Sequence, residues 1–379
     1  MFYIENLRLK GLRNYRNQEL QFNPRLNVIC GENAQGKTNL LEAIYYLSVT
    51  RSFRTKNDQE LANREDGFFY LKGKFIKNGF NHEVQVSYIP KSPLKVKINS
   101  DPVNRYAHLQ KFPVVVFSPD DLLLISEGPS IRRRFLNLEA SRLSSIYFDE
   151  LRSYQRVLQQ RNHLLKSLYN RNRRQADELL EPWDKSLVML GSRIIHSRLE
   201  LIMDLAEEAK IFFQHMTSFT ENISLFYESS IDYRESPEET GDAFYMALQE
   251  KRDLEIKRGS TVLGPHLDDL RIFIDGFDTR KYSSQGQKRT AALALKMAEV
   301  SLFKKEHEDY PIILLDDVFS EFDQGRKMHL LEFLKKSSGQ CFISTAGDTG
   351  ELIESLNRDY KIISIWQGRV CDEKSGPGN

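Results

Sequence analysis

Clustered cysteines and long apolar runs are both missing from this sequence. The three cysteines, Cys30, Cys341 and Cys371, lie far apart without metal-ligand spacing, which argues against a disulfide scaffold or a zinc site. No apolar run reaches the roughly 18 residues that a membrane-spanning helix needs. The opening stretch MFYIENLRLKGL carries charges where a signal peptide requires an apolar core. We therefore expect a cytoplasmic protein with reduced thiols.

An excess of one sign of charge is missing too. The 54 Lys and Arg residues nearly balance the 53 Asp and Glu residues, which leaves a net charge of +1. Overall charge therefore gives no sign of nucleic-acid binding, and any such signal must be local. The 379 residues are enough for one large domain or two lobes.

The pattern of apolar residues divides the chain into three parts. Strand-like alternation fills the first 120 residues, with a type I′ hairpin signal at Asn78-Gly79. Helical periodicity then dominates until strands return at LDDLRIFIDGF. We predict an α/β fold in which residues 1–125 and 258–370 form one lobe. A mainly helical lobe, 126–257, is inserted between them, and the tail, 371–379, is expected to be disordered.

Two apolar stripes predict a short antiparallel helical hairpin in the inserted lobe. One runs at heptad-like spacing from Tyr147 to Leu168, and the other runs from Leu187 to Leu205. The intervening stretch NRNRRQADELLEPWD is predicted to be a polar turn.

A phosphate-binding loop follows the apolar strand RLNVIC. The segment GENAQGKT fits the pattern G-x-x-x-x-G-K-[ST] between that strand and a helix predicted over 39–48. Backbone N–H groups would cradle phosphates, Lys37 would reach the β- and γ-phosphates, and Thr38 would hold Mg²⁺. ATP and Mg²⁺ are therefore the expected cofactors. The predicted ATP-binding residues are Gly31, Glu32, Asn33, Ala34, Gln35, Gly36, Lys37 and Thr38.

A second apolar strand ends in two acids. In PIILLDDVFSEFD, Asp316 stands at the end of the run 312–315, where it can bind Mg²⁺, and Asp317 can hold the attacking water. We predict Asp316 and Asp317 as catalytic residues and Thr38 and Asp316 as metal ligands. The alternative is a surface turn that happens to contain two acids.

A cluster of small residues and glutamines, SSQGQ, precedes a helix predicted over 288–300. Serine hydroxyls and the exposed N–H groups at a helix start can bind an anion. Ordinary capping of the helix by one of the serines is the alternative. The candidate residues are Ser283, Ser284, Gln285, Gly286 and Gln287.

Local basic charge is concentrated in residues 128–176, which contain 11 Lys/Arg and 3 Asp/Glu, a net of +8. Basic side chains can follow DNA phosphates without reading bases. The alternatives are a solvated helical face, salt bridges to nearby acidic stretches, or contacts that hold the two lobes together. The candidate DNA contacts are Arg132, Arg133, Arg134, Arg171, Arg173 and Arg174.

The segments GENAQGKT, SSQGQKRT and LLDDVFSEFD together resemble the ABC-type ATPases of chromosome maintenance and repair, which include the SMC and Rad50 heads. FSPDDL, EGPSIRRRFLN and GPHLDDL are similar to motifs of the RecF family, and the likeness covers residues 2–370. It implies an ABC-type P-loop ATPase lobe, ATP-dependent DNA binding in recombinational repair and the SOS response, and weak ATP hydrolysis. It also implies the partners RecO and RecR, which help to place RecA on gapped DNA.

The resemblance further implies a homodimer. SSQGQ aligns with the ABC signature segment, which would face the ATP held by a second, head-to-tail copy. Three positions depart from related patterns. Asp317 stands where glutamate is usual, which is consistent with slow turnover, Thr345 stands in a region where histidine is common, and Leu267 replaces an arginine.

Three other interpretations stay open at this point. A P-loop kinase or motor would need an acceptor pocket or motor domains that the motifs do not show. The ATPase subunit of a transporter would carry the usual signature and Asp-Glu pair. A structural SMC-type protein would need a far longer coiled coil than this hairpin.

Overall fold

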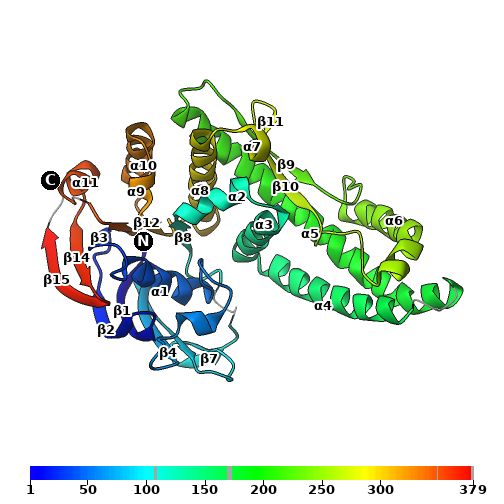
Figure 1. Ribbon diagram of the computed structural model, residues 1–379, viewed down its shortest axis with the longest axis horizontal. Helices are drawn as coiled ribbons and strands as arrows, with labels where there is room; N and C mark the ends of the chain where they lie inside the picture. Colours follow the sequence, from blue (N-terminus) through cyan, green and yellow to red (C-terminus); the bar gives the residue numbers. More distant parts are fainter. Residues whose placement is uncertain (106–108, 169–172, 348, 377–379) are drawn as a thin grey trace. The chain divides into compact units, whose positions relative to one another are not determined.

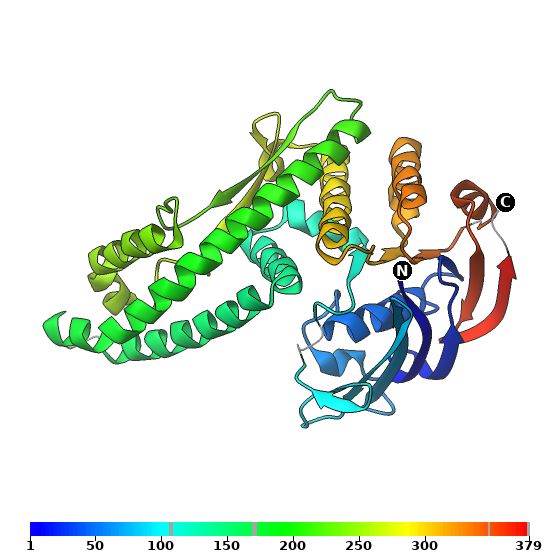
Figure 2. The same ribbon diagram turned by 180° about the vertical axis from the view of Figure 1, so that it is seen from behind.

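The computed structural model describes residues 1–105, 109–168, 173–347 and 349–376, and Figures 1 and 2 show it from opposite sides. The chain forms two compact units. Unit 1 contains Met1–Leu122, His215–Phe219 and Arg289–Asn379, and unit 2 contains Leu123–Gln214 and Thr220–Lys288. Unit 1 thus draws on both chain ends. The predicted return to it at residue 258 is wrong, because the chain stays in unit 2 until Lys288.

One sheet of unit 1 is antiparallel, with the strand order β2-β1-β4-β5-β6-β7. Its strands are β1 (Phe2–Leu12), β2 (Tyr15–Gln21), β4 (Phe69–Lys77), β5 (Phe80–Tyr88), β6 (Lys95–Ile98) and β7 (Asp101–Val103). Buried residues alternate with exposed or half-buried ones along β4 and β6, so only one face packs on the core. Asn78 and Gly79 join β4 to β5 with positive φ angles of 52° and 81°, as a type I′ turn requires.

The other sheet of unit 1 has the order β15-β14-β3-β13-β12-β8. Its strands are β3 (Leu26–Cys30), β8 (Val114–Phe117), β12 (Ile312–Asp316), β13 (Cys341–Thr345), β14 (Tyr360–Trp366) and β15 (Arg369–Gly376). All but β15 run parallel. Every residue of β8 and β12 is buried, which explains their unbroken apolar sequences. The loops that follow β3, β12 and β13 therefore leave from one edge of this sheet.

Helix α1 (Lys37–Val49) contacts strands of both sheets, including β1, β4, β12 and β13. It is buried along nearly its whole length, so it shows no polar face. Gly73 makes room for it, because a Cβ there would lie 2.7 Å from Leu47 Cδ1. Unit 1 also contains η1 (Asp58–Leu61), η2 (Pro119–Asp121), α9 (Val318–Glu321), α10 (Gln324–Lys336) and α11 (Gly350–Leu356).

The predicted disordered tail is wrong up to residue 376. Strand β15 pairs with β14 from Arg369 to Gly376 in antiparallel register. Its side chains are mostly exposed and polar, so composition alone suggested disorder. Backbone hydrogen bonds to β14 hold the strand, and Lys361 Nζ forms an ion pair with Glu373 at 2.9 Å. Residues 377–379 lie outside the described part.

Unit 2 combines a small antiparallel sheet, β11-β10-β9, with helices. Its strands are β9 (Ile223–Glu228), β10 (Asp269–Ile274) and β11 (Phe277–Asp278). The helices are α3 (Pro129–Leu143), α4 (Ser145–Ser167), most of α5 (Arg173–Met216), α6 (Pro237–Arg258) and α7 (Thr279–Tyr282). Strand β10 belongs here because all six of its residues pair with β9. Besides α5, whose last two residues belong to unit 1, two helices are shared between the units: α2 (Leu122–Ser126) and α8 (Gln285–His307).

The predicted helical hairpin corresponds to α4 and α5, which run in opposite directions in Figure 1. The predicted polar turn is wrong from Arg173 onward, because α5 begins there and continues through Pro182. The first residues of that turn, 170–172, lie outside the described residues. An internal proline costs a helix about 3 kcal/mol. Burial offsets that cost, since Ala176 and Leu180 pack against Leu165 and Leu168 of the facing segment. Within the described residues, no helix is long and apolar enough to cross a membrane.

Candidate nucleotide-binding site

The loop between β3 and α1 has backbone geometry that requires glycine. Gly31 and Gly36 have φ angles of 149° and 120°. A Cβ at Gly31 would lie 2.4 Å from the carbonyl oxygen of Ile365, and one at Gly36 would lie 2.8 Å from Asn14 Nδ2. Gly36 is the N-cap of α1 and no side chain caps that helix. Its first-turn N–H groups are therefore suited to an anion.

Residues that belong to no recognisable motif hold this loop in place through hydrogen bonds. Asn14 Nδ2 donates to the carbonyl of Gln35 at 2.9 Å, and the Tyr15 hydroxyl donates to the carbonyl of Gly36 at 3.0 Å. The backbone N–H of Gly368, in the turn between β14 and β15, also donates to Gln35 O at 2.9 Å. Sequence reasoning missed these residues, because they come from segments far from the loop in the chain.

The predicted phosphate-binding lysine lies across the loop. Lys37 Nζ donates to the carbonyls of Gly31 and Glu32 at 2.7 and 2.9 Å, and the side chain is 7% exposed. Glu32, Asn33 and Ala34 are exposed at the tip. The ammonium group therefore sits within the curve of the loop, beside the start of α1.

Strand order brings the two predicted metal ligands together. Strand β13 separates β3 from β12, and Thr38 Oγ1 donates to Asp316 Oδ1 at 2.8 Å. Ser344 of β13, which the sequence did not single out, donates to the same oxygen at 3.0 Å. Burial raises the pKa of Asp316, and these two hydrogen bonds partly oppose the shift.

Asp317 has an unusual backbone conformation. Its φ angle is 52°, in the left-handed region that non-glycine residues seldom adopt. Its N–H donates to Ser344 Oγ at 2.9 Å, and its carboxylate makes no capping bond to α9 although it occupies the N-cap position. The carboxylate is half-buried beside Asp316 and is available to orient a water molecule.

These residues fit Mg²⁺ that arrives with a nucleotide. Among the described residues, no group of three or more His, Cys, Asp or Glu could hold a metal by itself. Thr38 and Asp316 offer one hydroxyl and one carboxylate, which lie 2.8 Å apart. Mg²⁺ usually takes one or two carboxylates and completes its shell with phosphate oxygens and water.

Comparison with known proteins agrees with this geometry. Residues 3–368 match the family model "RecF/RecN/SMC N terminal domain". The "DNA replication and repair protein RecF" of Bacillus cereus (strain G9842) is 39% identical over 373 residues, which cover 97% of this chain and 98% of that protein. This chain belongs to the RecF family.

Solved structures support the RecF-family fold. One, described as "the recombination mediator protein RecF-ATP in RecFOR pathway", superposes with a TM-score of 0.89 at 33% identity and covers 98% of each chain. A Smc head domain from Pyrococcus furiosus, at 16% identity, has a TM-score of 0.56, covers 100% of this chain and 97% of its own, and shows the fold alone. The predicted α/β fold with an ABC-type ATPase lobe is confirmed.

The signature candidates of this RecF-family chain lie in unit 2. Gln287 N donates to Ser284 Oγ at 3.1 Å, and Ser284 N donates to Gln287 Oε1 at 2.8 Å. This reciprocal pair is a capping box for α8, so the capping interpretation describes what Ser284 does within the chain. Ser284 and Gln285 are nevertheless exposed, while Ser283 and Gly286 are half-buried.

Of the predicted DNA contacts, Arg132 is buried and Arg133 is half-buried. Arg132 is 4% exposed, and its Nε and Nη2 donate to the two carboxylate oxygens of Asp269 at 2.8 and 2.7 Å. Arg133 Nη1 donates to the carbonyls of Leu267 and Asp268 at 3.2 and 2.8 Å. The DNA prediction is wrong for Arg132, because its guanidinium is already enclosed by a partner on β10.

Of the other four predicted contacts, the structure describes the side chains of two, Arg134 and Arg174. Arg134 is half-buried. Arg174 is 90% exposed and forms an ion pair with Glu178 at 3.2 Å. Arg171 and the side chain of Arg173 lie outside the described residues.

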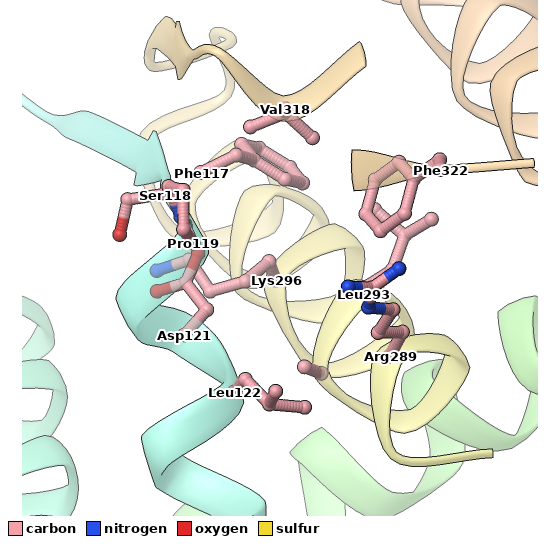
Figure 3. Close-up of a pocket in the computed structure, with 11 residues that line it drawn as sticks. Phe117, Ser118, Pro119, Asp121, Leu122, Arg289, Leu293, Lys296, Val318 and Phe322 are labelled. Atoms are coloured by element: carbon pink, nitrogen blue, oxygen red, sulfur yellow. Dashed lines mark hydrogen bonds between the residues drawn. The ribbon is translucent and has the colours of Figure 1, made fainter. Parts of the chain in front are cut away.

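Unit 1 also contains a small pocket, whose lining residues Figure 3 shows. Val318 and Phe322, which follow Asp317, line it together with Asp121 of η2 and Lys296 of α8. Its volume of about 50 Å³ is far too small for a nucleotide. Burial raises the pKa of Asp121 to about 6, and the nearby Lys296 opposes the shift. This pocket is therefore not the ATP site.

Proposed function

We propose that this RecF-family chain is an ATP-dependent DNA-binding protein of replication and repair, in which ATP and Mg²⁺ at the unit 1 site act as a switch. The observation that carries the proposal is the contact between Thr38 and Asp316, 278 residues apart in sequence, beside a glycine loop with Lys37 inside its curve. Family membership and the RecF-ATP relative support the same assignment.

Each site residue has a distinct role in the proposal. The loop from Gly31 to Gly36 and the start of α1 hold the phosphates, and Lys37 compensates charge on the β- and γ-phosphates. Thr38 and Asp316 hold Mg²⁺, which supplies charge neutralisation when bound. Asp317 orients the water that attacks the γ-phosphate. Since its side chain is one methylene shorter than glutamate, hydrolysis is expected to be slow.

A second copy of the chain completes the site in this proposal. Ser283 to Gln287, at the exposed start of α8, would contact the ATP of the partner chain, and the partner would do the same in return. Such an interface is isologous, with twofold symmetry. Loss of the γ-phosphate by hydrolysis would remove the bridging charge and open the dimer. RecO and RecR are the proposed protein partners, in line with the RecFOR pathway named for the relative.

Sedimentation velocity tests the composite site. Wild-type chain should be dimeric with ATP and monomeric with ADP. Ser284→Arg should abolish the dimer while ATP still binds the monomer. Ser284→Ala is the matched control, because it removes the capping oxygen without adding bulk, at a cost of about 1 kcal/mol to the helix. A Ser284→Arg protein that still dimerises with ATP contradicts the proposed interface.

Single-turnover hydrolysis tests the role of Asp317. Asp317→Asn should keep ATP bound and trap the dimer, since an amide orients the water but does not accept its proton. Unchanged hydrolysis in this variant would remove Asp317 from the mechanism without affecting the proposed ATP site.

A further inference from the structure

The antiparallel sheet of unit 1 has an outer face that the predicted function did not use. Its inner face packs against α1 through residues such as Leu71 and Gly73. Residues one step away along each strand point to the opposite side. The sequences LRLKG, YLKGKF and LKVKI therefore place every second residue, mostly lysine or arginine, on the outer face.

Strand register arranges these basic residues in two rows. In the first row, Arg8 of β1 is paired with Lys72 of β4, Lys72 with Gln85 of β5, and Gln85 with Lys97 of β6. The second row joins Lys10, Tyr70, Ser87 and Lys95 in the same strand order. Neighbouring strands are about 4.8 Å apart and neighbouring rows about 7 Å apart. The rows thus spread positive charge over roughly 14 Å from β1 to β6.

Four of these side chains are accessible. Lys72 and Lys74 are compensated by ion pairs with Glu83 and Glu5, each at 2.7 Å. Arg8, Lys10, Lys95 and Lys97 are exposed. Within the part of the chain that the structure describes, no ion pair joins these four to a carboxylate. Lys10 instead lies over the ring of Phe68, 5.8 Å from its centroid.

This arrangement is unfavourable for an isolated sheet. Directly paired like charges such as Arg8 and Lys72 destabilise a sheet by a few tenths of a kcal/mol up to about 1 kcal/mol. Three carboxylates share the face: Glu5 and Glu83 in the ion pairs above, and exposed Glu19 of β2, which is paired with Arg8 in register. The six basic side chains named above outnumber these three. A polyanion with regularly repeating charge would compensate the repulsion, and the nucleic-acid backbone is such a ligand.

We propose that Arg8, Lys10, Lys95 and Lys97 on the outer face of this sheet contact the phosphate backbone of duplex DNA without reading its sequence. A sheet face with flexible basic side chains suits phosphate contacts, because base readout requires an element that enters a groove. The inference rests on the proposed DNA-binding function and assigns a DNA contact to unit 1.

The test uses the full chain with ATP and a 30-base-pair duplex, followed by fluorescence anisotropy over a range of salt concentrations. The variant is Arg8→Gln/Lys10→Gln/Lys95→Gln/Lys97→Gln. Its control, Lys304→Gln/Lys305→Gln/Lys335→Gln/Lys336→Gln, removes four charges from exposed positions on α8 and α10 of the same unit. We expect the slope of log affinity against log salt to become shallower by up to about 3.6 in the sheet variant, with at least about tenfold weaker binding. The control should stay near wild type.

Three outcomes would overturn the inference, and they are distinguishable. If the sheet variant keeps the wild-type slope and affinity, the face does not contact DNA, while the proposed function stands. If both variants weaken binding equally, the effect is one of net charge. If wild-type chain fails to bind the duplex at any salt concentration, the proposed function fails as well. ATP affinity should be unchanged in both variants, and the sheet variant should unfold at the wild-type temperature or slightly above it, because like-charge repulsion is removed. A lost contact is thereby separated from a damaged fold.

Discussion

Basic residues serve opposite purposes in the two units. In unit 2, Arg132, Arg161, Arg198 and Arg252 are at most 4% exposed and are enclosed by partners. In the antiparallel sheet of unit 1, Arg8, Lys10, Lys95 and Lys97 are exposed. Charge density along the sequence favours unit 2, whereas accessible charge is arranged in rows on unit 1. The comparison shows that a count of basic residues says little until burial is known.

Unit 2 uses its buried arginines as internal connectors between its helices and strands. Arg161 of α4 donates to Asp184 of α5 and to Glu255 of α6, at 2.8 and 2.6 Å. Arg252 of α6 is also paired with Asp184. Such buried networks add little net stability compared with apolar packing, but removal of one member leaves an unpaired buried charge. The arginines therefore fix how the helices of this unit pack.

The largest effect should come from breaking one of these connectors. Arg132→Ala leaves Asp269 buried without its partner, and we expect it to lower the free energy of unfolding by about 3–5 kcal/mol. Arg174→Ala is the control on the same unit and should change it by less than about 0.5 kcal/mol. Urea denaturation measures both. A folded Arg132→Ala protein of wild-type stability that binds DNA more weakly would restore Arg132 as a DNA contact.

A smaller effect should appear at His266, another group enclosed in unit 2. Its Nδ1 lies 2.8 Å from the Tyr154 hydroxyl, and burial lowers the pKa of His266 to about 4. The folded state therefore binds the proton less tightly than the unfolded state. The contribution of neutral His266 to the free energy of unfolding is fully present above about pH 6.5 and is lost as the pH falls toward 4. His266→Asn keeps an acceptor for Tyr154 and should remove about 2–3 kcal/mol of this pH dependence.

Unfolding experiments on wild type and His266→Asn between pH 7.5 and 4.5 would measure that difference. Other groups titrate in this window, Asp121 among them, so the comparison of the two proteins matters and not either curve alone. If the two stability curves are parallel over this pH range, the pKa of His266 does not differ between the folded and unfolded states, and the prediction is wrong.

In unit 1, Asp316 is also buried, but its pKa is raised, so stability depends on pH in the opposite direction from that expected for His266. Burial raises the pKa of Asp316, so the folded state holds that proton more tightly, and stability falls as the pH rises through the raised pKa. Asp316→Asn removes the ionisation but keeps an oxygen for Thr38 and Ser344. We expect the variant to be more stable at pH 7 by about 1 kcal/mol and to lose the additional stabilisation by Mg²⁺ and ATP. Thermal unfolding with and without the ligands checks both effects, and a variant less stable than wild type would contradict the first.

Local motifs explain why the nucleotide site was predictable from sequence. Gly31 to Thr38 and the Asp316-Asp317 pair each carry their chemistry within a few consecutive residues, and strand order alone then brings them together. The partner of Arg132 is 137 residues away, so no local pattern distinguishes it from a surface arginine. The same limit applies to Ser344, whose role depends on the position of β13 between β3 and β12. The boundary at 258 was wrong for a similar reason, because only the pairing of β10 with β9 assigns that segment to unit 2.

The smallest expected effect concerns Arg174, the highly exposed arginine of α5 that was predicted to contact DNA. Arg174 and Glu178 form an i,i+4 ion pair with 90% and 65% exposed side chains. Exposed helical pairs contribute about 0.3–0.5 kcal/mol, and salt screens them. A double-mutant cycle with Arg174→Ala and Glu178→Ala should give a coupling of that size at low salt and none at 1 M salt. A coupling that persists at 1 M salt would mean that the pair is held by its surroundings, and Arg174 would then belong with the internal arginines of unit 2.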